Sequence, residues 1–472
     1  MKRWQICIII CLILTGLTAC GKDYSGEEVS TKEVVQKFEN FNYDSMKIPY
    51  YQKDNHVIAV SENGYYFVRN VSAWGYDNFV NLYYGRISEK SAIKASDKKK
   101  YGKVIYYYDI NKNTASPLCN KADCRHNTID CEAYFDNIND EDIQDNGGFV
   151  YYKNQLYMLS YDEKNGIKLL SYNNLGKDKK EVCVITDNPE YTPLSGSDND
   201  ICIFNQYVYC WGVRSMDESL QSEIVLFKTN IENGNSDIVF QYKETANQNK
   251  VTKNYSRDIE IANNKIYFSI CLYDEESDEL IYSLYESDGT EGSNFNKVFN
   301  VSSAKDCNDR DKDKENYSMK NYALDNQNNL YFVDEIESDK LNVSCILYKY
   351  NFTDKTITKI NEFNTIGYKV VCDDTYIYLS LYDQFIFLNK DGQIVYQKYI
   401  GADKNNSSGK AEVVGVDDRY VIIRTDNISD FSFNNLEDNT IIDSDKFAVL
   451  DKSLIGTGKE EWIEMYNGNF IQ

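Results

Sequence analysis

The sequence predicts an all-β fold, and three observations lead to that fold class. The first is composition: Tyr (41) and Phe (21) supply most of the 14% aromatic residues, whereas Pro occurs only 4 times. Aromatic residues favour strands, and clusters of Asn, Asp and Gly favour the tight turns between strands. The second observation is a recurring phrase in which Asn or Asp introduces a Tyr-rich run. The third is the spacing of that phrase along the 472 residues.

The phrase is clearest at Asn328–Phe332, and the predicted strands 330–336, 343–350 and 356–363 follow from it. Each copy is followed by a second run that ends in a polar turn, and usually by a third run such as 181–185. The seven copies begin at Asn63, Asn154, Asn205, Asn264, Asn329, Asp374 and Asp418, and the second runs are 104–109, 168–173, 224–228, 280–286, 345–350, 384–389 and 446–451.

The intervals between copies of the phrase indicate how the predicted strands are arranged. The shortest intervals, from 329 to 374 and from 374 to 418, match the roughly 40–50 residues of a four-stranded propeller blade. One blade cannot bury both of its faces, so blades stack radially and close into a ring. We therefore expect a seven-bladed β-propeller over residues 49–472. The interval from 63 to 154 is long enough to contain an eighth blade, and a ring of six blades is the other alternative.

The N-terminal residues predict the cellular location of the protein. Lys2 and Arg3 precede an apolar run at 6–17, which has the length of a signal peptide and is short for a membrane span. The run ends in Leu-Thr-Ala-Cys at 17–20, which resembles a bacterial lipobox. This resemblance implies that residues 1–19 are removed and that Cys20 is lipidated; an ordinary signal peptide that happens to end in Cys is the alternative. Two acyl chains of roughly 15 methylenes, at about 0.8 kcal/mol per CH₂, would hold the protein on its membrane.

A polar tether and a short helix are expected next. Residues 20–29 are predicted to be the lipidated Cys and its tether. Ser30 to Glu33 has the spacing of a capping box, and Val34, Val35, Phe38 and Phe41 fall on one helical face. We expect one amphipathic helix within 30–48 that packs against the propeller.

The densest cluster of reactive side chains lies in the insertion around 117–135. Cys119, Cys124, His126 and Cys131 place three thiols and one of only two histidines within thirteen residues. A disulfide staple suits an exported protein, and three thiolates with an imidazole also form a valid structural zinc set, although this spacing is not a common zinc template. A reactive thiol activated by Arg125 and His126 is the third alternative. Zinc here is the single candidate cofactor.

The remaining cysteines and tryptophans have simpler predicted roles. Cysteines that stand singly in strand-like runs are expected to be buried small hydrophobes. Cys202 and Cys210 flank a turn and form a possible pair. Trp74 and Trp211 each precede Gly, so each either stacks on a sugar or packs in the core.

Charge and absent motifs exclude several classes of function. The formal net charge is -23, and the basic residues are scattered, which argues against nucleic-acid binding. No nucleophile elbow, His-Glu-x-x-His pair, phosphate loop or dinucleotide fingerprint occurs. The acidic run 309–313 lacks the Gly and Glu of a calcium loop, so we expect a solvated loop there. A catalytic role is not expected for His56, the other histidine.

The lipobox, the repeated phrase and the cysteine insertion together resemble predicted β-propeller lipoproteins of Gram-positive anaerobic bacteria, which are related in pattern to TolB-like and YWTD-type propellers. The YWTD tetrapeptide itself is absent. That family has no assigned reaction, so the resemblance implies a fold and an extracytoplasmic location at the cell membrane. We expect a non-enzymatic module that binds an envelope glycan, peptide or protein. A carbohydrate-active enzyme with a carboxylate pair over the propeller channel, and a structural scaffold, are the alternatives.

Overall fold

The computed structural model divides the chain into two units, residues 1–45 and 46–472. The predicted signal peptide, Cys20, its tether and the predicted helix within 30–48 all lie outside the described residues, as does His56. Within the described part, no helix is long and apolar enough to cross a membrane. The structure describes residues 51–52, 58–61, 64–72, 101–119, 121, 133, 148–162, 164–173, 180–194, 201–216, 221–245, 258–274, 277, 279–304, 317, 319, 321–339, 342–381, 384–399, 410–426 and 445–466.

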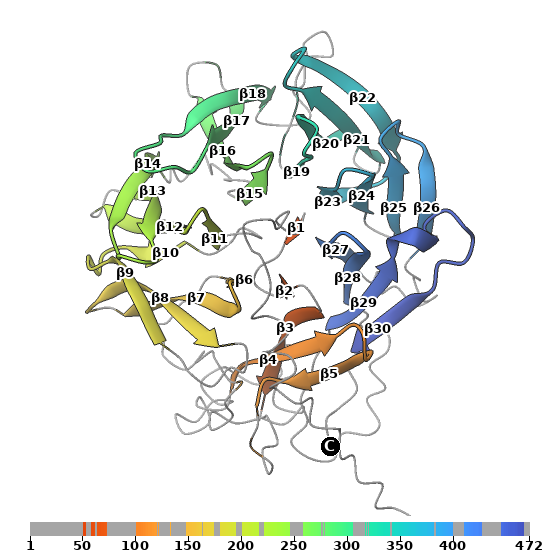
Figure 1. The fold of residues 1–472 in the computed structure, drawn as a ribbon. Coiled ribbons are helices and arrows are strands. Elements are labelled where there is room, and N and C mark those ends of the chain that lie inside the picture. Colours follow the sequence, from red (N-terminus) through yellow and green to blue (C-terminus); the bar gives the residue numbers. More distant parts are fainter. Residues whose placement is uncertain are drawn as a thin grey trace, which may run out of the picture. The chain divides into compact units, whose positions relative to one another are not determined.

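Seven antiparallel sheets form seven blades arranged as a ring (Figure 1). Blade 1 is β2 (Ile58–Ser61), β3 (Gly64–Ser72), β4 (Tyr101–Asp109) and β5 (Thr114–Pro117); blade 2 is β6 (Phe149–Tyr152), β7 (Gln155–Asp162), β8 (Gly166–Asn173) and β9 (Lys180–Thr186); blade 3 is β10 (Thr192–Pro193), β11 (Ile201–Phe204), β12 (Tyr207–Met216), β13 (Gln221–Asn230) and β14 (Ser236–Thr245). The prediction of a seven-bladed propeller is confirmed.

The other four blades follow in chain order. Blade 4 is β15 (Ile259–Ala262), β16 (Lys265–Asp274), β17 (Glu279–Ser287) and β18 (Asn296–Ala304); blade 5 is β19 (Asn321–Leu324), β20 (Asn329–Asp339), β21 (Asn342–Asn351) and β22 (Thr356–Phe363); blade 6 is β23 (Gly367–Cys372), β24 (Tyr376–Leu381), β25 (Gln384–Asn389) and β26 (Ile394–Tyr399); blade 7 is β27 (Lys410–Val416), β28 (Tyr420–Asp426), β29 (Asp445–Asp451) and β30 (Trp462–Tyr466). A short 3-10 helix, η6 (Lys452–Leu454), follows β29.

The repeated phrase marks the turn between the first and second strands of every blade. In blades 2, 3 and 4 this turn has two residues, and both have positive φ, as at Asn263 (50°) and Asn264 (55°). Such turns match the right-handed twist of a hairpin, and Asn tolerates the left-handed conformation better than most residues. The Asn residues of the phrase therefore have a local backbone role, which explains why they recur.

The hydrophobic core lies between neighbouring blades. Trp211 of blade 3, for example, is 1% exposed and packs edge-on against Phe268 of blade 4, with ring centroids 5.1 Å apart. Similar clusters join blades 2 and 3, blades 4 and 5, and blades 5, 6 and 7. Each blade therefore buries its faces against its neighbours, and the core runs from blade to blade around the ring.

The ring closes between blades 7 and 1 by packing and by one very short strand. Phe67 of blade 1 lies 5.3 Å from Phe447 of blade 7, centroid to centroid, inside a cluster that both blades share. In addition, β1 (Tyr51–Gln52) pairs antiparallel with β27, the innermost strand of blade 7. Figure 1 shows β1 near the centre of the ring. The blades at the two ends of the propeller are therefore held without exchanging an outer strand.

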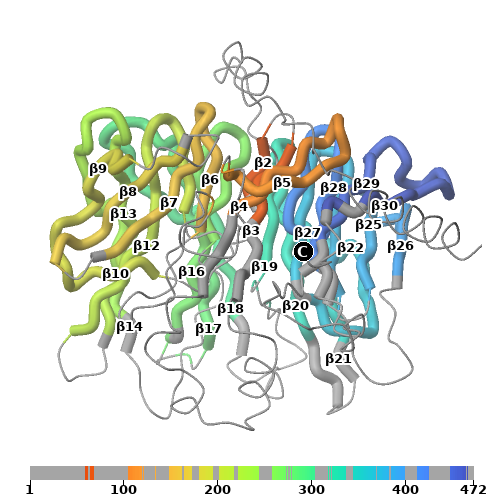
Figure 2. The backbone as a smooth tube through the Cα atoms, turned by 90° about the horizontal axis from the view of Figure 1, so that it is seen from below, coloured from red at the N-terminus to blue at the C-terminus, as the bar shows by residue number. Residues whose placement is uncertain are grey.

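The two ends of the ring differ (Figure 2). In a meander the first-to-second and third-to-fourth turns share one end of each blade, which we call the turn face. The second-to-third connections and the blade-to-blade connections share the opposite end, which we call the loop face. The connections of more than ten residues all begin and end at the loop face, and most of their residues lie outside the described part. They are 73–100, 118–148, 246–258, 305–320 and 427–444.

Candidate functional site

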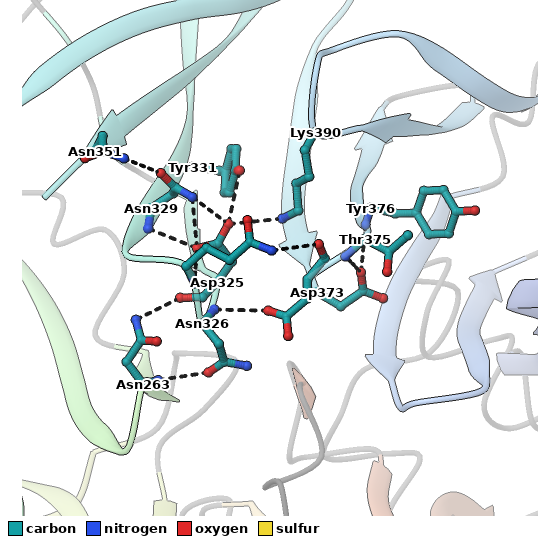
Figure 3. A network of polar contacts seen from close by, with 12 residues as sticks. Asn263, Asp325, Asn326, Asn329, Tyr331, Asn351, Asp373, Thr375, Tyr376 and Lys390 are labelled. Atoms are coloured by element: carbon teal, nitrogen blue, oxygen red, sulfur yellow. Dashed lines mark hydrogen bonds and ion pairs between the residues drawn. The ribbon is translucent and has the colours of Figure 1, made fainter. Parts of the chain in front are cut away.

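A buried carboxylate organises the turn face at blade 5. Asp325 is 2% exposed and follows directly after β19. Its carboxylate accepts hydrogen bonds from the backbone N–H groups of Gln327 and Asn329, both at 2.9 Å, and from the Tyr331 hydroxyl at 3.1 Å. Lys390 of blade 6 completes the set with an ion pair at 3.3 Å (Figure 3). One aspartate therefore fixes its own turn and binds the next blade.

The same arrangement recurs one blade further on. Asp373 follows β23, accepts from the N–H groups of Thr375 and Tyr376 at 2.7 Å, and accepts from the Tyr378 hydroxyl at 2.7 Å. Its cation is Lys452 of blade 7, at 2.6 Å. The positions correspond, because Lys390 and Lys452 each directly follow the third strand of their blade.

At the ring closure the arrangement changes. Asp417 follows β27 and accepts from the N–H groups of Arg419 and Tyr420, at 2.7 and 2.6 Å. The position in blade 1 that corresponds to the two lysines is Ile110, which carries no charge. Instead, the hydroxyl of Tyr65 in blade 1 donates to Asp417. Blades 7 and 1 are therefore joined by a neutral donor.

Amide groups extend the network along the turn face. The N–H of Asn263 in blade 4 donates to the side-chain oxygen of Asn326 in blade 5 at 2.9 Å, and the N–H of Asn326 donates to Asp374 in blade 6 at 3.3 Å (Figure 3). Burial raises the pKa of Tyr331 and of Tyr378, so both phenols stay protonated and remain donors. Because the donors and acceptors of this network are paired with one another, we assign the network a structural role.

On the loop face, one described cluster fixes the connection that enters blade 3. Glu223 of β13 is 8% exposed, accepts a hydrogen bond from the Tyr191 hydroxyl at 2.7 Å and forms an ion pair with Arg214, whose Nε lies 2.6 Å from the carboxylate. The Arg214 guanidinium also lies 5.1 Å from the centre of the Tyr191 ring. The Tyr191 hydrogen bond lowers the pKa of Glu223, helped by Arg214 against the opposing effect of burial. A carboxylate of this kind is ionised at neutral pH and does not serve as a general acid.

A second loop-face cluster crosses from blade 6 to blade 7. Glu412 of β27 lies 3.5 Å from Lys369 of β23 and 3.3 Å from Arg424 of β28. Lys369 has a side chain only 4% exposed. In both of these clusters each carboxylate is paired with a cation or a hydroxyl.

Of the four predicted site residues in the cysteine insertion, the structure describes Cys119. This residue is half-buried beside the core shared by blades 1 and 7, while Cys124, His126 and Cys131 lie outside the described residues. The N–H of Leu118 donates to Ile105 O, and the N–H of Ile105 donates to Ala133 O, both at 3.0 Å. The insertion therefore starts and ends beside one residue of β4. Within the described part of the chain, no group of three metal-ligating side chains occurs.

The structure decides two of the other predictions. Trp211 packs in the core, so stacking on a sugar is wrong for it; Trp74 lies outside the described residues. Cys202 pairs in register with Tyr209, and Cys210 pairs with Ile201, so the two cysteines point to opposite faces of the sheet and do not pair. Cys183, Cys345 and Cys372 are buried as expected, and burial raises the pKa of Cys183 to about 11 and of Cys345 to about 12.

Comparisons with known proteins bear on the fold alone. No family model matches the sequence, and no curated protein matches it. The structure is similar to the β-propeller domain of the Trilobed protease from Pyrococcus furiosus, with a TM-score of 0.44 and 10% identity, over 87% of this chain and 95% of that one. It is also similar to an uncomplexed acylaminoacyl peptidase from Pyrococcus horikoshii, with a TM-score of 0.45 and 10% identity, over 88% of this chain.

This chain spans about half of that peptidase, 52% of its length. An oligogalacturonate lyase in complex with manganese matches with a TM-score of 0.39 and 12% identity, over 73% of this chain and 83% of that one. Similarity at this level carries no argument about activity.

Proposed function

We propose that this protein is a membrane-anchored extracytoplasmic lipoprotein whose propeller binds a ligand or protein partner with its loop face and does not transform it. The observation that carries the proposal is the difference between the two faces. The described turn face is crossed by short turns whose carboxylates are paired within the ring. The longest connections all belong to the loop face. Binding residues concentrate on loops that a rigid scaffold positions.

The anchor rests on Cys20 and the sequence before it. Its test is metabolic labelling with palmitate in the full-length protein. Labelling of the wild-type protein that is lost in Cys20→Ala is the expected outcome, and labelling of both proteins to the same extent would remove the anchor. Cys119→Ala is a matched control, because it also deletes a thiol but leaves the 17–20 motif intact.

The binding activity calls for a separate test with defined probes. Purified wall glycan fragments, short peptides from envelope proteins and intact envelope proteins should be titrated against the full-length protein, and each mixture should then be analysed for products by mass spectrometry. Saturable binding of one probe class without any product supports the proposal. Conversion of a probe would favour the carbohydrate-active alternative, and saturation by none of the three classes would favour the scaffold.

The cysteine insertion is proposed to be a structural element of the loop face, closed by a disulfide or by zinc. Native and denaturing mass spectra of the protein, purified without chelator, separate these two forms. A zinc mass that disappears on denaturation, followed by alkylation of Cys119, Cys124 and Cys131, indicates a metal site. Thiols that stay protected with no metal indicate a disulfide. Free thiols and no metal would contradict both forms.

A further inference from the structure

The direction of β1 fixes the face at which the N-terminal part of the chain joins the propeller. Tyr51 pairs with Val416 and Gln52 pairs with Gly415. Val416 is the last residue of β27, and the turn-face residues 417–419 follow it directly. Moving from Tyr51 to Gln52 therefore means moving away from the turn face. The N-terminal end of β1 lies at the turn face, on the inner edge of blade 7.

This attachment point is also central rather than peripheral. β27 is the innermost strand of its blade, and β1 lies on the inner side of β27, near the middle of the ring in Figure 1. A chain attached at the rim could place either face toward a surface. A chain attached at the centre of one face must first cross half the ring and then pass along its side before it brings the opposite face toward its anchor.

We propose that the turn face is directed toward the lipid bilayer and that the loop face is presented away from it. This proposal rests on lipid attachment at Cys20, which belongs to the proposed function, and it goes beyond that function by assigning the partner of the turn face. About 30 residues separate Cys20 from β1. Turning the loop face toward the lipid would use part of that length to cross the turn face and pass the side of the ring, so this connection favours the face from which it starts.

Three carboxylates of the turn face, at Asp325, Asp373 and Asp417, are occupied by hydrogen bonds within the ring. Groups that are already paired in this way lose little when another surface restricts their exposure to solvent. Other acids of this face, such as Asp391 and Asp418, are exposed.

The test measures energy transfer from a fluorophore on each face to acceptor-labelled lipid headgroups, with the full-length lipidated protein in phosphatidylglycerol and phosphatidylethanolamine vesicles. Two exposed positions near blade 6 form a matched pair: Asp391 in the turn between β25 and β26, and Asn364 in the connection between β22 and β23. p-Azidophenylalanine at either position allows labelling that leaves the cysteines untouched.

We expect about twofold greater energy transfer from position 391, because strands of six residues separate the two faces by about 20 Å. Equal transfer, or greater transfer from position 364, in protein that is bound to the vesicles would overturn the orientation and leave the anchor intact. Protein that fails to bind the vesicles would overturn the anchor, and the orientation with it.

A variant with proline at both residues of β1, Tyr51→Pro and Gln52→Pro, removes the backbone donors that pair with β27. If its circular dichroism matches that of the wild type, the difference between the two positions should shrink. A difference that persists at full size would mean that β1 does not set the orientation and would contradict the proposal.

Discussion

At the scale of single residues, the most consequential groups are aspartates that serve two blades at once. Asp325 and Asp373 each cap a turn of their own blade and accept a lysine from the next. Burying a carboxylate costs free energy unless its charge is compensated, and the lysines lower that cost for these aspartates. Sequence reasoning identified the turns but missed this pairing, because Asp325 and Lys390 are far apart in the chain and nothing in their local sequence links them.

Removal of one such lysine should be far more costly than removal of an exposed one. Lys452→Met leaves Asp373, which is 2% exposed, without its cation, and we expect a loss of about 3 kcal/mol in the free energy of unfolding. Lys359→Met is the matched control, because its partner Glu362 is 43% exposed, and it should cost less than about 0.5 kcal/mol. Urea unfolding followed by tryptophan fluorescence measures both. Equal midpoints for the two variants would contradict the structural role assigned to Lys452.

The Tyr191 hydrogen bond to Glu223 should be visible as a pH-dependent term in stability. The folded-state pKa of Glu223 lies below its ordinary value of 4.5, with the Tyr191 hydrogen bond as the largest cause. Its stabilising effect is therefore fully present above pH 4.5 and is lost as the pH falls through the folded-state value. The difference in unfolding free energy between the wild type and Tyr191→Phe should be constant near neutral pH and shrink in acid.

A second tyrosine serves as the control for that experiment. The Tyr396 hydroxyl accepts a hydrogen bond from the Trp462 indole at 2.8 Å and has no carboxylate partner in that bond. The effect of Tyr396→Phe on unfolding should therefore depend little on pH between 3 and 7. Parallel behaviour of the two variants would show that Glu223 is not the source of the pH dependence.

At the scale of elements, the repeated Asn phrase was sufficient to find the second strand of every blade, and the runs after it gave the third. The innermost strands were not recognised individually. Most of them, such as β11 and β15, are only four residues long and almost wholly buried, so they show neither alternation nor a turn signal of their own. In blade 3 the inner edge is further divided, because β10 and β11 both pair with β12.

The two-residue turns should tolerate glycine and reject β-branched residues. Asn264 has a φ of 55° and is exposed, so a new side chain there changes backbone preference with little effect on packing. Asn264→Val should destabilise the protein by about 1–3 kcal/mol, because a β-branched residue is strained at positive φ. Asn264→Gly should cost less than about 1 kcal/mol. Thermal unfolding of the two variants makes the comparison, and equal losses would mean that backbone conformation does not select Asn at this position.

At the scale of the whole molecule, the ring is a closed series of blade interfaces, of which one joins the two ends of the propeller. That closure depends on the core shared by blades 1 and 7, on the Tyr65 donor and on β1. The sequence predicted a ring from the number and spacing of the repeats and from the need of each blade to bury its faces. It gave no signal for β1, because a two-residue strand has no detectable period. The cysteine insertion, by contrast, was evident in the sequence but lies almost entirely outside the described structure.

The interface between blades 7 and 1 should be able to open while the other blade interfaces stay closed. Phe447→Ala removes a side chain that is 1% exposed and should cost about 3–5 kcal/mol. Phe332→Ala, in the core between blades 4 and 5, should cost a similar amount. Hydrogen exchange distinguishes the two, because only Phe447→Ala should accelerate exchange in β3 and β28 together. Faster exchange in these strands in both variants would show that the ring opens as a whole.

The central claim is that the loop face of an anchored propeller binds a partner without transforming it, and hydrogen exchange on the complex tests it most directly. The full-length protein should be saturated with whichever wall glycan, peptide or envelope protein it binds, and the same sample should be searched for products. We predict protection at loop-face segments such as 364–366, the end of β12 and the start of β13, no change at turn-face residues such as 325–329 and 373–376, and no product. Protection confined to the turn face, or conversion of the probe, would contradict the claim.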